Sequence, residues 1–215
     1  MNKDKITEFV LSKEIYSKKI CSEYKKMSKA FLGVGVLLAT LLLLISHVIG
    51  VSNYQMLIMI LPCLLGVILS FMFGTQYDGN SKQNALKVDA MAEFARFLFL
   101  GGTLVGLSAG STGDSFYTYY VLVCFISVMC IPMHICLIRR RIKRGKYNQN
   151  HYNNVSSWLI FIVLGISTSM GLYGNKNDVI TIFASITPFL VVAFEYTTIK
   201  KYLKYFYAKK YSIGI

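Results

Sequence analysis

Few side chains in this sequence have the types and spacing that catalysis requires, and most of them lie between residues 89 and 113. There the sequence reads DAMAEFARFLFLGGTLVGLSAGSTG, and Ser108 stands within GLSAG, a match to the G-x-S-x-G pattern of nucleophilic serines. We expect His47 at a similar depth in another apolar segment, so one hypothesis is a hydrolase that uses Ser108 and His47. The pattern works on a strand–turn–helix elbow, which a membrane helix does not provide. We therefore expect a protein that is not an enzyme.

GLSAG also resembles the G-x-S-[GA] motif of the rhomboid proteases, and this resemblance implies an intramembrane serine hydrolase. In that family the histidine lies in a late helix and is flanked by small residues. His47 instead lies in LISHVIG, within the first apolar segment. Because of this departure, helix packing remains our interpretation of the small residues around Ser108.

Three charged residues stand within or beside apolar segments and form a predicted intramembrane cluster. Glu93 and Arg96 are three residues apart at the start of the third segment, and Glu195 lies near the end of the sixth. Residues at this spacing can pair on one helical face. Charges inside a bilayer are costly unless they are paired or reach the interface. We predict that Arg96 bridges Glu93 and Glu195; proton or ion coupling through Glu195 is the alternative.

Metal-binding and redox motifs are sparse. Cys130 and His134 are four residues apart and share a helical face, but no third ligand stands nearby. The sequence contains neither CxxC nor HExxH. We therefore expect no metal site and no cofactor.

Small residues and prolines give two structural predictions. Gly102, Gly106 and Gly110 recur every fourth residue and form a ridge along one helical face. Small residues allow a neighbouring helix to approach closely in a membrane, so a helix of this chain, of a partner or of a second copy packs on this ridge. Helix kinks are predicted at Pro62, Pro132 and Pro188.

These residues are distributed over six long apolar segments. Hydrophobic residues make up 54% of the 215 positions and charged residues only 15%. Segments of roughly 20 apolar residues span a bilayer, where backbone groups must bond internally as helices. We predict an all-α bundle of six transmembrane helices, arranged as three hairpins within residues 30–199. The expected spans are about 30–51, 54–75, 94–113, 117–138, 156–174 and 178–199.

The distribution of positive charge predicts the orientation of the bundle. The formal net charge is +13, and every Lys and Arg except Lys176 lies before the first span, in 76–96, in 139–154 or after the last span. These regions all lie on one side of the predicted bundle, so the positive-inside rule places both termini in the cytoplasm. The same rule explains the charge without nucleic acid, and we expect no nucleic-acid partner.

The two ends of the chain are predicted to contact the membrane surface. Residues 1–29 read as a basic amphipathic helix, with Ile20, Tyr24, Met27 and Phe31 on one face. Such a helix lies along the anionic inner leaflet, although a solvated tail is the open alternative. Residues 200–215 read as a basic and aromatic interfacial tail. The excess of Lys over Arg is typical of AT-rich, Gram-positive genomes, which indicates a bacterial plasma membrane.

Two resemblances give the functional hypotheses. In size, topology, lysine content and minimal loops the chain resembles the immunity proteins that Gram-positive bacteria keep against membrane-active toxins and bacteriocins. This resemblance implies a non-enzymatic protein that binds a partner or protects the membrane. Six helices with small residues on the first, such as Gly35 and Ala39, also resemble the substrate-binding subunits of energy-coupling-factor vitamin transporters. Those subunits have a gating loop where this chain has only Ser52 and Asn53, so transport is the alternative.

A cavity would separate the two hypotheses. A transporter requires a pocket with convergent polar groups, and a closed bundle with an apolar outer groove favours partner binding. The polar residues that we expect in such a transport pocket are Ser46, Ser111, Ser167 and Thr168.

Overall fold

The computed structural model describes residues 3–12, 52–75, 82–112, 115–146 and 176–213, with isolated positions between 29 and 44. Every regular element in these ranges is helical, which confirms the all-α prediction for them. The helices are α1 (Lys3–Leu11), α3 (Asn53–Thr75), α4 (Lys82–Ser111), α5 (Phe116–Lys143) and α7 (Lys176–Lys210).

Three of these helices are long and apolar enough to cross a membrane. The qualifying segments are Asn53–Phe73, Gln83–Gly110 and Phe116–Lys143, and they overlap the predicted spans 54–75, 94–113 and 117–138. The predicted span 156–174 lies outside the described residues, as does most of 30–51, where the described positions are helical. The six-span bundle and its orientation therefore stay predictions.

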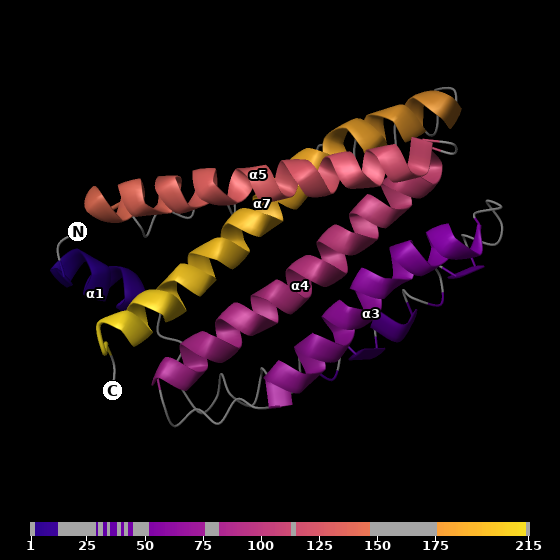
Figure 1. Cartoon of the computed structure of the whole chain (residues 1–215). Coiled ribbons are helices and arrows are strands. Elements are labelled where there is room, and N and C mark those ends of the chain that lie inside the picture. Colours follow the sequence, from indigo (N-terminus) through magenta and orange to yellow (C-terminus); the bar gives the residue numbers. More distant parts are fainter. Residues whose placement is uncertain are drawn as a thin grey trace.

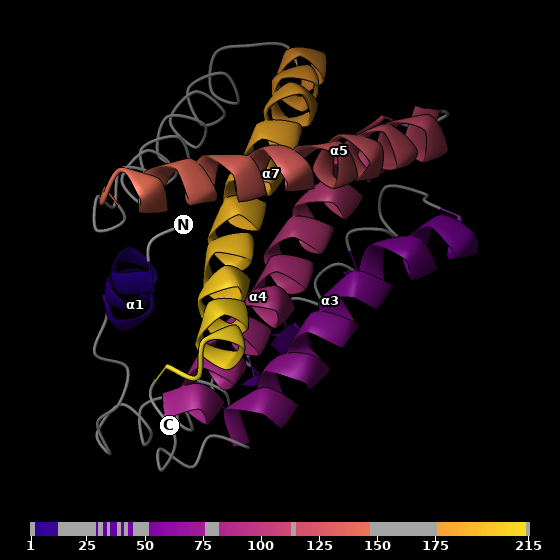
Figure 2. The same cartoon turned by 60° about the vertical axis from the view of Figure 1, so that its left-hand side comes forward.

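Helices α4 and α7 lie side by side at the centre of the described structure and run in opposite directions, and the other helices pack against them. Figure 1 shows α3 on the other side of α4, while Figure 2 shows α5 crossing α7. The N-terminus, the C-terminus, the end of α5 and the start of α4 gather at one end of the molecule (Figure 1). This end carries most of the described Lys and Arg residues.

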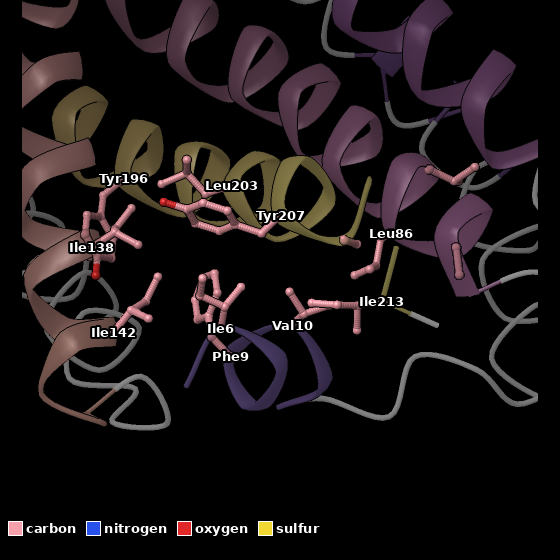
Figure 3. Close-up of a cluster of buried hydrophobic side chains, with 13 residues drawn as sticks. Ile6, Phe9, Val10, Leu86, Ile138, Ile142, Tyr196, Leu203, Tyr207 and Ile213 are labelled. Atoms are coloured by element: carbon pink, nitrogen blue, oxygen red, sulfur yellow. The ribbon is translucent and has the colours of Figure 1, made fainter. Parts of the chain in front are cut away.

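A cluster of buried hydrophobic side chains lies at this basic end, and side chains of α1 pack in the middle of it (Figure 3). Ile6, Phe9 and Val10 of α1 are each at most 1% exposed. They pack with residues of the three helices that meet there: Leu86 of α4, Ile138 and Ile142 of α5, and Leu203 and Tyr207 of α7. At spacings of three and one, the α1 residues form one helical face. This face packs on protein, whereas the face predicted to lie on lipid, from Ile20 to Phe31, lies outside the described residues.

Two lysines form hydrogen bonds that join α1 and the residue after it to α5 and α7. Lys5 donates from Nζ to the carbonyl oxygen of Lys143 at 2.8 Å, at the C-terminal end of α5, where helix carbonyls have no helical partner. Lys204 is 7% exposed and donates to Ser12 Oγ at 2.7 Å. Its ammonium also lies 5.4 Å from the centre of the Phe9 ring.

The C-terminal segment continues α7 as far as Lys210 without a break. Leu203, Tyr207 and Ala208 of this segment are 0–6% exposed, and they face protein. The helix ends where Ser212 adopts φ 51° and Ile213 N–H donates to the carbonyl of Ala208 at 3.0 Å. The basic and aromatic tail is thus a helical extension that forms part of the cluster.

Candidate functional site

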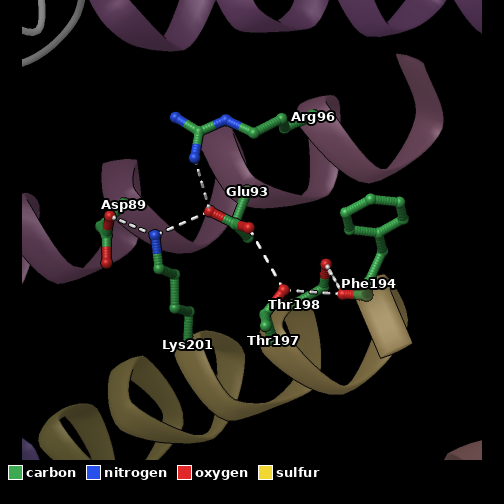
Figure 4. Close-up of polar contacts among 7 residues, drawn as sticks. All are labelled: Asp89, Glu93, Arg96, Phe194, Thr197, Thr198 and Lys201. Carbon is green, nitrogen blue, oxygen red and sulfur yellow. Dashed lines mark hydrogen bonds and ion pairs between the residues drawn. The ribbon is translucent and has the colours of Figure 1, made fainter. Parts of the chain in front are cut away.

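An ionic cluster joins α4 to α7 (Figure 4). Lys201 of α7 lies between Asp89 and Glu93 of α4, with Nζ 3.0 Å from Asp89 Oδ1 and 2.7 Å from Glu93 Oε2. Thr197, one turn earlier on α7, donates to Glu93 Oε1 at 3.2 Å. The carboxylate side chains are only 7% and 13% exposed, so the cluster is largely removed from solvent.

The two carboxylates determine the charge state of Lys201. Burial by itself lowers the pKa of this ammonium, because it disfavours the charged form. The negative charges of Asp89 and Glu93, and their hydrogen bonds, more than offset burial and raise the pKa above its ordinary value. Lys201 therefore remains a cation throughout the physiological pH range.

The structure contradicts part of the predicted Glu93–Arg96–Glu195 cluster. Arg96 pairs with Glu93, with Nη1 3.2 Å from Oε2, and its side chain is 40% exposed. Among the described residues it makes no ion pair with Glu195. Lys201 and Glu195 are six residues apart, which places them about 120° apart around α7. Lys201 therefore faces α4 while Glu195 faces α5.

Sequence reasoning missed Lys201 and Asp89 as members of this cluster. Asp89 is four residues before Glu93, and Lys201 is four residues after Thr197. This spacing places the members of each pair on one face. The spacing was a usable signal, but only the packing of α4 against α7 brings the two faces together.

Glu195 lies in a buried polar contact between α5 and α7. It is 4% exposed, and its Oε2 accepts a hydrogen bond from Ser127 Oγ at 2.9 Å. Its other oxygen, Oε1, is buried and has no hydrogen-bond partner within the described ranges. Ser127 lies halfway along α5, twelve residues or about 18 Å before Arg139. The carboxyl therefore lies well inside the bundle.

His134 continues this polar contact toward the basic end of α5. It is 3% exposed, and its ring centre lies 5.5 Å from that of Tyr196. The backbone of Val192 lies beside the ring, but neither ring nitrogen makes a well-aligned hydrogen bond with a described residue. Tyr196 accepts a hydrogen bond from Arg141 Nη1 at 3.1 Å. Ser127, Cys130 and His134 thus share the face of α5 that meets α7.

The predicted nucleophile Ser108 packs between α4 and α7. It is 0% exposed, and its Oγ lies 2.6 Å from Thr187 Oγ1. The Tyr119 hydroxyl interacts with both. GLSAG lies on a continuous helix and forms no elbow, and His47 lies outside the described residues. The described part of the chain also holds no group of three His, Cys, Asp or Glu side chains arranged to bind a metal.

The glycine ridge faces α3 of the same chain. A Cβ added at Gly102 would overlap Pro62, and one at Gly106 would come within 3.2 Å of Met59 Cα. At Gly110 the neighbour is the end of the Met59 side chain, at 3.3 Å. Gly66 of α3, which the sequence analysis missed, is the described glycine that lies closest to backbone atoms of a neighbouring helix. A Cβ there would lie 2.6 Å from both Ala95 O and Phe99 N on the α4 backbone.

An apolar groove of about 230 Å³ lies on α4 between α3 and α5. Gly101 and Gly102 line it together with Pro62 of α3 and Val123 and Val128 of α5. Tyr120, Cys124 and Ser127 contribute the few polar groups. Of the residues expected in a transport pocket, Ser46, Ser167 and Thr168 lie outside the described residues, as does the side chain of Ser111.

Pro62, Pro132 and Pro188 all lie inside continuous helices, and their kinks stay predictions. Comparison of the whole chain with protein-family models, with curated proteins and with solved structures finds no match.

Proposed function

We propose that this protein is a non-enzymatic multi-pass membrane protein that binds a partner within the bilayer, and that it is of the immunity type that protects a bacterial plasma membrane. The observation that carries the proposal is the apolar groove between α3 and α5. Its lining is mostly apolar, with glycines at 101 and 102 on α4. Such a lining suits an apolar helix better than a polar solute.

The surroundings of the groove suit a helical partner. Val128, on the groove, is 63% exposed, and Phe125 and Met129 beside it on α5 are 60% and 61% exposed. Large side chains at the rim and glycine at the floor allow an incoming helix to interdigitate with α5 and approach α4 closely. Ser108 supports a role without catalysis, because its hydroxyl is buried and bonded to Thr187.

Membrane depolarisation in a deletion strain tests the proposal. Cells that lack the gene are challenged with a panel of pore-forming peptides and complemented with the wild type, Val128→Trp or Val121→Trp. Val121 is 65% exposed and lies two turns from Val128 on α5, but it does not line the groove. We expect deletion and Val128→Trp to increase depolarisation, and Val121→Trp to protect like the wild type. An unchanged response of the deletion strain to every peptide overturns the proposal.

A transport component is the second candidate, and the buried polar contact between α5 and α7 favours it. Glu195 and His134 are at most 4% exposed and retain unbonded polar atoms within the described ranges. Ionisable groups inside membrane bundles often mark solute or ion pathways. Uptake of a panel of labelled solutes by proteoliposomes tests this candidate. Flux that Glu195→Gln abolishes would support it, and absence of flux for the whole panel would count against it.

A further inference from the structure

Only one of the two carboxyl oxygens of Glu195 has a hydrogen-bond partner among the described residues. Oε2 is bonded to Ser127, whereas Oε1 is buried without a partner among the described residues. No Lys or Arg described in the structure forms an ion pair with it. A carboxylate in a dry interior needs several donors or a cation to replace water. One serine hydroxyl does not meet this need.

The titratable groups around Glu195 do not supply the positive charge that an ionised carboxylate would need there. On α5, Cys130 lies within electrostatic range, and His134 follows one turn later on the same face. A cysteine thiolate would repel a carboxylate, and His134 forms no ion pair with Glu195 among the described residues. On α4 and α7, Asp89, Glu93 and Lys201 are engaged in their own ion pairs, and Arg96 binds Glu93.

We propose that Glu195 is a proton-binding site, in which the side chain holds its proton at neutral pH as a neutral carboxylic acid in the α5–α7 contact. The Ser127 hydroxyl donates to Oε2, and the acid proton resides on Oε1. Loss of this proton creates an unpaired negative charge between the helices, so deprotonation weakens the packing of α5 on α7. This inference does not rest on the partner-binding proposal, although Ser127 also lines the apolar groove.

Dicyclohexylcarbodiimide tests the proposal, since it reacts with protonated carboxyl groups in apolar surroundings. The acid adds across the carbodiimide, and the adduct rearranges to a stable acylurea that mass spectrometry locates. The purified full chain in detergent is labelled at pH 8, where an exposed glutamate favours the ionised form by roughly a thousandfold or more. Glu93 serves as the internal control, because it is a largely buried glutamate of the same chain that is ion-paired with Lys201 and Arg96.

We expect label on Glu195 but not on Glu93, and no label at position 195 in Glu195→Gln. An unlabelled Glu195 in folded protein overturns the proposal. Prior addition of Na⁺ or K⁺ distinguishes the bound species. Labelling that persists supports a proton, and labelling that either ion suppresses overturns the proposal in favour of a metal-cation site.

The pH dependence of unfolding gives a second readout that needs no labelling. A neutral acid and its amide are nearly isosteric, so Glu195→Gln should unfold at the same denaturant concentration as the wild type near pH 4, where the unfolded chain also holds most of this proton. The folded state holds a proton that the unfolded state releases above the ordinary glutamate pKa, so wild-type stability falls relative to that of the variant as pH rises. Cys130 and His134 are present in both proteins, so their titration cancels. Parallel curves from pH 6 to 9, displaced by a constant amount, overturn the proposal.

Discussion

At the scale of single residues, Lys201 is the centre of the charged cluster and Arg96 lies at its edge. Lys201 contacts two carboxylates that are at most 13% exposed, whereas the half-buried Arg96 contacts only one of them. Removing one partner of a buried ion pair leaves the other charge uncompensated, which costs far more than losing an exposed pair. The two cations of the cluster therefore differ in importance, although both are bonded to Glu93.

We predict that Lys201→Met destabilises the protein by about 3 kcal/mol, because Asp89 and Glu93 then lose the cation between them and Glu93 keeps only the more exposed Arg96. This figure is at the low end of the usual range, since the Lys201 side chain is 26% exposed. Arg96→Met should cost about 1 kcal/mol or less. Unfolding in mixed micelles, followed by circular dichroism, measures both. Equal losses in the two variants would contradict this assignment.

The raised pKa of Lys201 gives this prediction a pH window. The folded chain binds the Lys201 proton more strongly than the unfolded chain does. The Lys201 charge therefore contributes fully to folding stability below the ordinary lysine pKa of about 10.4, and this contribution is lost as pH rises above the pKa of Lys201 in the folded chain. The difference between wild type and Lys201→Met should thus stay constant from pH 6 to 9 and shrink only in more alkaline solution.

At the scale of elements, α3 and α4 touch through glycines on both helices. Gly102 and Gly106 admit the Pro62 and Met59 region of α3, and Gly66 admits the α4 backbone near Ala95 and Phe99. Backbone-to-backbone contact of this kind strengthens dispersion and weak Cα–H hydrogen bonds, which replace the hydrophobic effect inside lipid. The ridge therefore fixes the pairing of α3 with α4, and the groove beside it remains open.

We predict that Gly66→Ala destabilises the α3–α4 contact by about 2–3 kcal/mol, because overpacked side chains force helices apart. The new methyl group would meet backbone atoms at 2.6 Å, and these cannot rotate away. Gly101→Ala is the matched control, since its nearest neighbour is the Phe97 ring at 3.5 Å, an ordinary contact. The unfolding midpoint in detergent measures both changes. A Gly101→Ala loss as large as that of Gly66→Ala would show that the contact tolerates no small-to-large change of any kind.

At the scale of the whole molecule, positive charge and both chain ends gather at one end of the bundle. There α1 buries Ile6, Phe9 and Val10 among the ends of α4, α5 and α7. The opposite end includes Ser115, at the turn between α4 and α5, which is exposed. This separation fits the charge rule that predicts a cytoplasmic location for the basic end.

Single cysteines in a cysteine-free background test this orientation. We expect Ser115→Cys to react with a membrane-impermeant maleimide in intact cells, because the predicted orientation places the turn after α4 outside the cell. Lys209→Cys, on the exposed side of the end of α7, should react only after the cells are permeabilised. Reaction of Lys209→Cys in intact cells, with Ser115→Cys protected, would reverse the predicted topology.

The sequence by itself determined the helical class, the positions of α3 and α5 to within a few residues, and the close packing at the Gly102 ridge. These follow from local rules: lipid forces the backbone into helices, and a four-residue period fixes one face. Only the tertiary structure decided which faces meet. The rotation of α7 about its axis places Lys201, and not Glu195, against α4, and it leaves Glu195 with Ser127 as its partner. The sequence could not predict the contact of Gly66 with the α4 backbone or the burial of α1, because each depends on residues far away in the chain.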